Sequence, residues 1–149
     1  METQEFKAIR KYLQKTQEQM ARLLGISVKA IRSYEQGWRA IPVYAERQLL
    51  FLAAKKAEIL QPVKSCWTIN KCKEKQKEQC PAWEFQAGKL CWFISGTICS
   101  GEVHKDWREK LEICKKCKAF PSSLKELLRI TPHNVAEAIQ DSEYFNPHK

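Results

Sequence analysis

The stretch TQEQMARLLGISVKAIRSYEQGWR, residues 16–39, decides the fold of the N-terminal part of the chain. Thr16 is placed to cap a helix, and Gln19 follows three residues later, as a capping box requires. Gly25 can adopt the left-handed conformation that ends this helix and turns the chain. Ser27 can then cap a second helix. Two short helices joined by a turn around a glycine are the plan of a helix-turn-helix.

Apolar residues at helical spacing predict which side of each helix is buried. The residues expected on the buried faces are Phe6, Ile9 and Leu13; Met20, Leu23 and Leu24; and Val28 or Ala30 with Ile31 and Tyr34. The helix that begins at Ser27 stops at Gly37, and Pro42 next allows a fourth helix over residues 43–60, which are rich in strong helix formers. The sequence therefore predicts an N-terminal bundle of four to five short helices.

Several positions within residues 16–39 carry the pattern of a known family. They are Thr16-Gln17 opening the first helix, Ala21 where the helices cross, Gly25 in the turn, Ser27, Ile31 in the core and Tyr34-Glu35-Gln36-Gly37 at the end. With these positions, which match without a gap, the chain resembles the Xre-type helix-turn-helix family of phage repressors and Cro proteins over about residues 3–60. The resemblance implies binding of double-stranded DNA through the helix from Ser27 to Gln36, which would enter the major groove.

The resemblance also implies which side chains face the DNA. These are Gln17, Ser27, Val28, Lys29, Arg32, Ser33, Trp38 and Arg39. Lys29 and Arg32 could read guanine edges or hold phosphates, and Val28 could touch a thymine methyl group. Gln17, Trp38 and Arg39 are expected to contact phosphates. The alternative is that the basic residues form an ordinary solvated helix face.

The composition fits a folded protein with a polyanionic partner. Hydrophobic residues make up 44% of the 149 residues, and the five Trp also argue against disorder. The net charge of +9 favours nucleic acid or another polyanion. No apolar run approaches the roughly 20 residues that a membrane span needs, and the N-terminus METQEFKAIRKYL lacks the apolar centre of a signal peptide. We therefore expect a cytoplasmic protein.

All seven cysteines fall between Cys66 and Cys117, in a region that also holds four of the five Trp. This distribution divides the chain into three parts. We expect a DNA-binding domain over residues 1–61, a cysteine-rich domain over residues 62–120 and a helical tail over residues 121–149. The tail has helical spacing in two segments, which could pack on the domains or form a dimer contact. Their apolar residues are Leu124, Leu127 and Leu128, and Val135, Ala138 and Ile139.

Metal binding explains the clustering of the thiols better than the alternatives. A disulfide framework is disfavoured in a cytoplasmic protein, and an odd number of cysteines leaves one over. Thiolates bind zinc and iron strongly, and a small domain gains folding free energy from a bound metal. The candidate ligands are Cys66, Cys72, Cys80, Cys91, Cys99, Cys114 and Cys117.

The spacing of these cysteines favours an iron-sulfur cluster over zinc. Cys114 and Cys117 form a C-x-x-C pair, which places two thiolates on one ion or cluster, and Cys80 is followed by proline, as in many iron-sulfur sequences. The other spacings suit a cluster gathered from several loops better than a zinc ribbon. We therefore expect a [4Fe-4S] cluster, with zinc as the alternative and a thiol-based switch as a third possibility. His104 is the only histidine in this part, and a lone histidine is more often exposed than a ligand.

A second resemblance covers about residues 64–120. Its motifs are Cys66-Trp67, Cys72, Cys80-Pro81-Ala82, Cys91-Trp92, the stretch GTICSG over residues 96–101 and CKKC over residues 114–117. Together they resemble the bacterial and archaeal "two-CW" cysteine-rich domain, which implies a shared fold and a metal centre without naming the metal. Trp67 and Trp92 could shield a cluster from water, although core packing is the more frequent role of Trp.

The sequence as a whole predicts a mainly α protein: a helix-turn-helix bundle, a small loop-rich cysteine and metal module, and a short helical tail. We expect a homodimeric transcription regulator whose iron-sulfur cluster senses redox state, oxygen or nitric oxide. One alternative is a constitutive DNA-binding regulator with a structural zinc, and a weaker one is an electron-transfer protein. Because the sequence has no catalytic triad, paired carboxylates or phosphate loop, we do not expect an enzyme.

Overall fold

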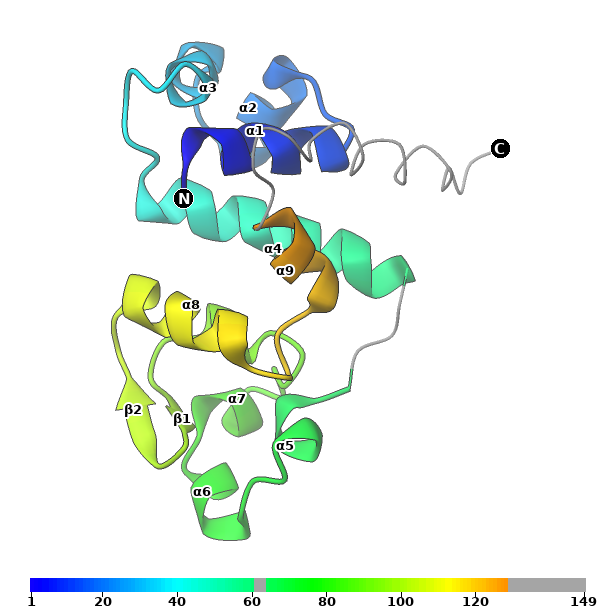
Figure 1. Cartoon of the computed structure of the whole chain (residues 1–149), viewed down its shortest axis with the longest axis vertical. Coiled ribbons are helices and arrows are strands. Elements are labelled where there is room, and N and C mark those ends of the chain that lie inside the picture. Colours follow the sequence, from blue (N-terminus) through cyan, green and yellow to red (C-terminus); the bar gives the residue numbers. More distant parts are fainter. Residues whose placement is uncertain (61–63, 129–149) are drawn as a thin grey trace. The chain divides into compact units, whose positions relative to one another are not determined.

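The computed structural model describes residues 1–60 and 64–128 and is mainly helical, as the sequence predicts (Figure 1). The chain forms two compact units. The first contains Met1–Ala57 and the described residues from Ser123 onward, and the second contains Glu58–Ser122. The second apolar segment expected in the tail, which includes Val135, lies outside the described residues.

The first unit consists of helices whose ends follow the local signals in the sequence. The helices are α1 (Thr3–Tyr12), α2 (Gln17–Leu24), α3 (Val28–Glu35), α4 (Val43–Leu60) and α9 (Ser122–Leu127). The Thr16 side chain accepts a hydrogen bond from the Gln19 backbone, and Gln19 completes the capping box. Gly25 has a φ of 65°, and the Ser27 hydroxyl accepts a hydrogen bond from the Ala30 backbone. These contacts confirm the predicted helix, turn and second helix.

The core of the first unit contains most of the residues expected there. Phe6, Ile9, Met20 and Ile31 are fully buried, and the Phe6 ring meets the Tyr34 ring edge to face. Leu23 was expected in the core, and that prediction is wrong because its side chain is 47% exposed. The buried residues of α2 are Met20, Ala21 and Leu24. At 100° per residue, Leu23 lies more than a quarter turn away from the middle of that face.

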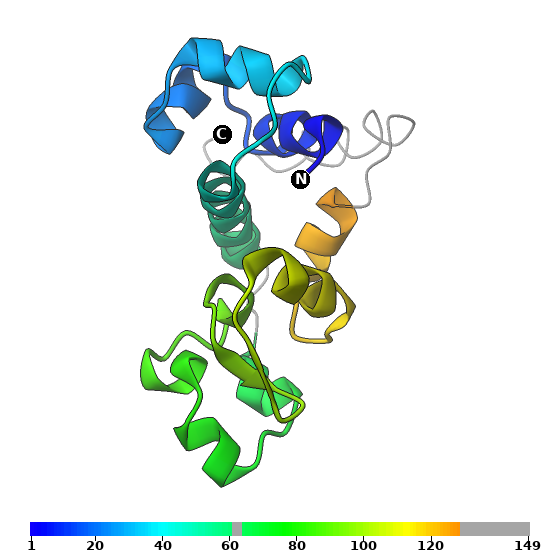
Figure 2. The same cartoon turned by 90° about the vertical axis from the view of Figure 1, so that its left-hand side faces the viewer.

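The second unit is built from short elements. They are α5 (Cys66–Ile69), α6 (Glu74–Glu78), α7 (Pro81–Glu84), the 3-10 helix η1 (Cys91–Phe93), strands β1 (Thr97–Cys99) and β2 (Glu102–His104), and α8 (Trp107–Lys116). The two strands pair antiparallel through a two-residue turn at Ser100 and Gly101, both with positive φ. Helix α8 packs on η1 and on β2, and Figure 2 shows α8 beside the hairpin.

Aromatic side chains supply much of the core of the second unit. Trp92 is fully buried, and its ring lies within about 6 Å of the rings of Phe93, Trp107 and Phe120. Trp67 is only half-buried, and it packs edge to face on Trp83 at a ring separation of 5.0 Å. The two tryptophans that follow a cysteine therefore have different surroundings, with Trp92 in the aromatic core and Trp67 in a separate aromatic pair.

Gly88 is required by the close approach of Trp67. A Cβ atom at residue 88 would lie 2.5 Å from the Trp67 ring and 2.8 Å from the Ser65 Cβ. We therefore expect Gly88→Ala to lower the free energy of unfolding of the second unit by about 1–3 kcal/mol, the usual cost of overpacking. Urea denaturation followed by tryptophan fluorescence measures this change. In a Trp67→Ala background the same substitution should cost less, and equal costs in both backgrounds would contradict the steric explanation.

Candidate functional site

The residues expected to face DNA lie on α3 and at its two ends, except Gln17 at the start of α2, and most of them are exposed. Ser27, Lys29, Arg32 and Arg39 are exposed, and Gln17 and Val28 are half-buried. Trp38 is 77% exposed, which is unusual for so large an apolar side chain. The first unit therefore presents three cations and an indole on or just after its second helix-turn-helix element.

Ser33 differs from the other residues of this set. Its side chain is buried, and its hydroxyl donates a hydrogen bond to the Lys29 carbonyl one turn earlier in the same helix. The hydroxyl is thus engaged within α3, while Lys29 remains exposed. In this structure the Ser33 side chain lies on the buried side of α3 and is not part of its exposed surface.

Arg32 is held at the surface by weak contacts. Its guanidinium lies 3.7 Å from the Glu18 carboxylate and 3.4 Å from the Gln17 side-chain oxygen. Both ionic partners are more than half exposed. Such an exposed pair contributes about 0–1 kcal/mol, so the guanidinium can exchange Glu18 for a DNA phosphate or base at small cost.

A buried carboxylate fixes α3 against the two preceding helices. Both oxygens of Glu35, near the end of α3, accept hydrogen bonds from the Arg10 guanidinium of α1. The Gln17 side-chain amide of α2 donates to the same carboxylate at 2.8 Å. The fork geometry of arginine and carboxylate is a strong, directional contact. Glu35 therefore sets the position of α3, and with it the position of the exposed cations.

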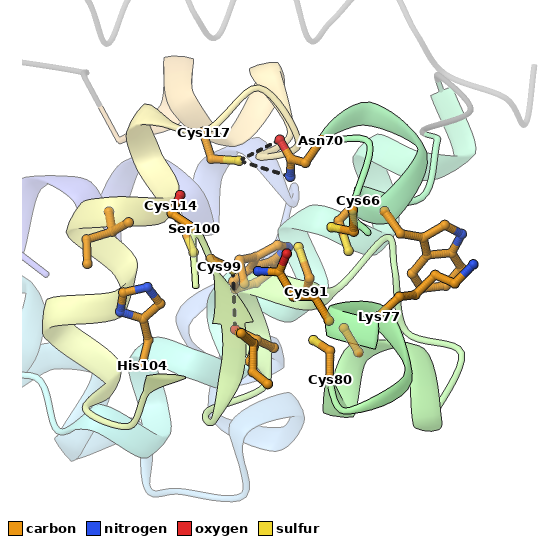
Figure 3. A pocket seen from close by; sticks show the side chains of 18 of the residues that line it. Cys66, Asn70, Lys77, Cys80, Cys91, Cys99, Ser100, His104, Cys114 and Cys117 are labelled. Carbon is orange, nitrogen blue, oxygen red and sulfur yellow. Dashed lines mark hydrogen bonds between the residues drawn. The ribbon is translucent and has the colours of Figure 1, made fainter. Parts of the chain in front are cut away.

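All seven cysteines line one cavity of about 490 Å³ in the second unit. They come from separate elements: α5, the loops before α6 and α7, η1, β1 and α8 with its C-terminal cap. Figure 3 labels Cys66, Cys80, Cys91, Cys99, Cys114 and Cys117 around this space, with His104 also at its wall. No disulfide joins cysteines in the described residues. The structure thus brings together every cysteine that the sequence singled out.

Cys66 and Cys91 contact each other in this cavity. The hydrogen bond from Cys91 lowers the pKa of the Cys66 thiol to about 7, against the opposing effect of burial, and the Trp67 backbone adds a further hydrogen bond. The same bond to Cys66, together with burial, raises the pKa of Cys91. Cys66 is therefore the member of the pair that ionises, and Cys91 is the donor.

Burial governs the ionisation of three further thiols. It raises the pKa of Cys114 to about 11, and it raises the pKa values of Cys72 and Cys99 as well. The Lys110 ammonium acts in the opposite direction on Cys114 and, after the Thr97 hydrogen bond, on Cys99. Without a bound cation, these thiols are protonated at neutral pH.

Cys117 accepts hydrogen bonds from two N–H groups. The Ala119 backbone N–H lies 3.4 Å from the Cys117 sulfur. The Asn70 side-chain nitrogen lies 3.6 Å from the same sulfur, and the Cys117 thiol can in turn donate to the Asn70 side-chain oxygen at 3.7 Å (Figure 3). N–H donors of this kind stabilise a thiolate, and they are among the contacts that tune sulfur-ligated metal centres. The C-x-x-C pair thus has one cysteine, Cys114, on the buried face of α8 and one with donors already at its sulfur.

Lysines give the cavity wall a positive charge. It includes Lys71, Lys73, Lys77, Lys110 and Lys116, and among its described lining residues there is neither Asp nor Glu. Four of these lysines are partly or fully exposed, whereas Lys110 is 1% exposed. Among the described lining residues, the thiols are the only groups that can carry negative charge at neutral pH.

The sequence-based prediction assigned no structural role to Lys110 or Glu35, although Lys110 had a signal. Lys110, Leu111 and Cys114 follow Trp107 by three, four and seven residues and so share one helical stripe with it, where a lysine is unexpected. Glu35 was named only as part of the family pattern, and its pairing had no signal, because its partner Arg10 lies 25 residues away and only the fold brings them together.

Comparisons with known proteins give a match only within the first unit. Residues 6–42 match the helix-turn-helix family model HTH_3, and no family match confirms the cysteine-rich part. Neither the curated proteins nor the solved structures contain a match to the chain. The helix-turn-helix match, together with the exposed face of α3, supports a DNA-binding transcription regulator. In the described ranges no helix has the length and apolar character needed to cross a membrane.

Proposed function

We propose that this DNA-binding regulator is a homodimer that holds a [4Fe-4S] cluster in its thiol-lined cavity and changes its DNA affinity with the state of that cluster. The observation that carries the proposal is the convergence of all seven cysteines on one cavity, although they are spread over 52 residues. Cysteines buried only for packing would have no reason to share a single wall.

The donor geometry fits a cluster better than a single ion. Four thiolates around one zinc ion, at 2.3 Å each, lie about 3.8 Å from one another in a tetrahedron. Among the described residues, no group of three or more Cys, His, Asp or Glu side chains lies close enough together to hold a single metal ion. In a [4Fe-4S] cluster each thiolate binds a different iron, so the sulfurs surround a larger object. A cavity of about 490 Å³ with thiols on several sides suits that arrangement.

A buried donor without an acceptor also fits a sulfur-rich group in this cavity. Trp92 lines the cavity, and its indole N–H is buried with no hydrogen-bond partner among the described residues. A buried unsatisfied donor is costly, and each one in a folded protein needs an explanation such as an unseen ion. Cluster sulfides and thiolates are acceptors for such N–H groups.

The side chains of the cavity would hold the cluster and limit its access to water. Cys66 and Cys117 are the first candidate ligands because backbone or side-chain N–H groups already point to their sulfurs, and Cys114 joins them through the C-x-x-C spacing. Trp92 and Phe120 close the wall with apolar surface. When bound, the cluster would supply one-electron redox chemistry and reactivity toward oxygen and nitric oxide.

The link to DNA is the folding free energy that cysteine ligation adds to the second unit. A small unit of short elements depends on its bound metal for stability. Losing the ligation would loosen α8 and the hairpin that carry Cys114, Cys117 and Cys99. In a homodimer this would change the spacing of the two recognition helices and therefore the affinity for two half-sites.

Anaerobic purification followed by iron, sulfide and zinc analysis and visible absorbance tests the cofactor. The same preparation, before and after cluster removal, is then titrated with an operator selected from random DNA at fixed salt concentration. We expect a brown protein with about four irons per chain and at least tenfold different affinities in the two states. Equal affinities would reject sensing, and a colourless protein with zinc would reject the cluster.

The exposed cations of α3 should dominate DNA affinity. We expect Lys29→Ala and Arg32→Ala each to weaken operator binding about tenfold or more, since a cation on a guanine edge contributes about 1–3 kcal/mol. If either side chain binds a phosphate instead, its removal lowers the salt slope of log K by about 1. Fluorescence anisotropy at several salt concentrations measures both effects. Lys11→Ala, an exposed cation on α1, is the matched control, and an equal loss there would contradict binding through α3.

The regulator with a purely structural zinc is the second candidate, and one observation is compatible with it. Cys114 and Cys117 have the C-x-x-C spacing that zinc sites share with iron-sulfur sites. In that case the metal would add stability to the second unit without changing DNA affinity on oxidation. The metal analysis and the DNA titration above separate the two candidates.

A further inference from the structure

Lys110 is a buried cation whose presence the helix-turn-helix and the aromatic core do not explain. Its side chain is 1% exposed, and its ammonium group donates a hydrogen bond to the Thr97 hydroxyl. In the described part of the chain no carboxylate forms an ion pair with it. An ionised amine removed from water and paired with a neutral hydroxyl alone is strongly unfavourable.

The surroundings of Lys110 indicate what balances its charge. The residue lines the thiol cavity, and its positive charge acts on Cys66, Cys91, Cys99 and Cys114. The described lining residues include no acid, so the balancing charge comes either from thiolates or from an anion inside the cavity. Four thiolates on zinc or on an oxidised [4Fe-4S] core both carry a net negative charge, whereas protonated thiols carry none.

We infer that Lys110 is the fixed counter-charge of the thiolate centre: a positioning residue that disfavours the metal-free cavity and stabilises the metal-loaded one. The inference rests on the part of the proposed function that places a thiolate-held metal in this cavity, and it does not depend on which metal is bound. Thr97 orients the ammonium group, and the Thr97 hydroxyl also accepts a contact from the Cys99 sulfur at 3.8 Å.

Opposite effects on the stability of the metal-free and the metal-loaded protein distinguish this role from ordinary packing. Lys110→Met keeps the length of the side chain and removes the charge. Without metal, the variant should be more stable than the wild type, because an unbalanced buried cation has been removed. With metal, it should be less stable, because the centre has lost its counter-charge. A residue that only packs would change both states in the same direction.

The experiment compares urea denaturation midpoints of the full chain with and without metal, and retention of the metal against a competing chelator. We expect Lys110→Met to raise the metal-free midpoint, lower the loaded midpoint and weaken metal retention at least tenfold. Lys110→Arg keeps the charge and should preserve the wild-type difference between the two midpoints. Lys105→Met removes an exposed lysine of the same unit and serves as the matched control.

The outcomes separate this inference from the proposed function. The role of Lys110 would be overturned if Lys110→Met showed the same difference between the metal-free and metal-loaded midpoints as the wild type. It would also be overturned if Lys105→Met weakened metal retention equally. A wild-type protein that gains no stability from iron with sulfide or from zinc would overturn it too. If the protein bound zinc, or if its DNA affinity were the same with and without metal, the sensing proposal would fail. A higher metal-free midpoint together with a lower metal-loaded midpoint in Lys110→Met would still establish the counter-charge.

For an iron-sulfur centre the same charge has a second readout. Removing a nearby positive charge disfavours the added electron, so Lys110→Met should lower the reduction potential. We expect at least a tenfold change in the reduction equilibrium, which is 59 mV for a one-electron couple. A potential equal to that of Lys105→Met would count against the counter-charge.

Discussion

Replacing Glu35 by alanine is expected to unfold the first unit or leave it marginally folded, and to abolish operator binding. The Glu35 carboxylate is 3% exposed and receives donors from Arg10 and Gln17, while the Arg10 side chain is 13% exposed. Truncation leaves the guanidinium nearly buried without its anion. Breaking a buried pair from one side costs about 3–5 kcal/mol, against a total stability of about 5–15 kcal/mol for a typical domain.

Circular dichroism during urea denaturation measures the loss of helix, and DNA titration measures the loss of affinity. Glu35→Gln keeps the shape and one acceptor oxygen, so it should cost less than Glu35→Ala. Glu18→Ala removes an acid that is 55% exposed and pairs with Arg32, and it should cost less than about 1 kcal/mol. If Glu35→Ala were no more destabilising than Glu18→Ala, the buried network would not hold α3 in place.

The first unit could be predicted almost completely because its signals are local. The cap at Thr16, the left-handed Gly25 and the cap at Ser27 each act within one helical turn, and the apolar spacing of Ile31 and Tyr34 settles which face turns inward. What the sequence could not supply were contacts between residues far apart. The burial of Glu35 depends on Arg10 in another helix, and no periodicity within α3 reveals it.

The second unit could be predicted only as a class. The density of cysteines indicates a shared centre, but which thiols meet depends on turns between very short elements. The hairpin had a recognisable signal in Ser100-Gly101, where two residues of positive φ join β1 and β2. Lys110 was visible as a charge in an apolar stripe. The contact of Cys91 with Cys66, by contrast, links η1 to α5 and could be found only in the fold.

The cysteines should separate into ligands and supporting residues. We expect Cys66→Ser and Cys117→Ser each to lose most of the bound iron, because these sulfurs already have N–H donors that stabilise a thiolate ligand. Loss of one of four thiolate ligands leaves an iron open to solvent. Iron content and absorbance of anaerobically prepared variants measure the loss, and circular dichroism shows whether each variant still folds.

Cys91→Ser is the matched control, because Cys91 is the donor to Cys66 and a serine hydroxyl can donate in the same direction. This variant should keep most of its iron, so the same substitution in the same cavity would give opposite results at two sulfurs that contact each other. If Cys91→Ser lost as much iron as Cys117→Ser, Cys91 would itself be a ligand. The N–H donors at Cys66 and Cys117 would then not be the feature that selects four sulfurs from seven.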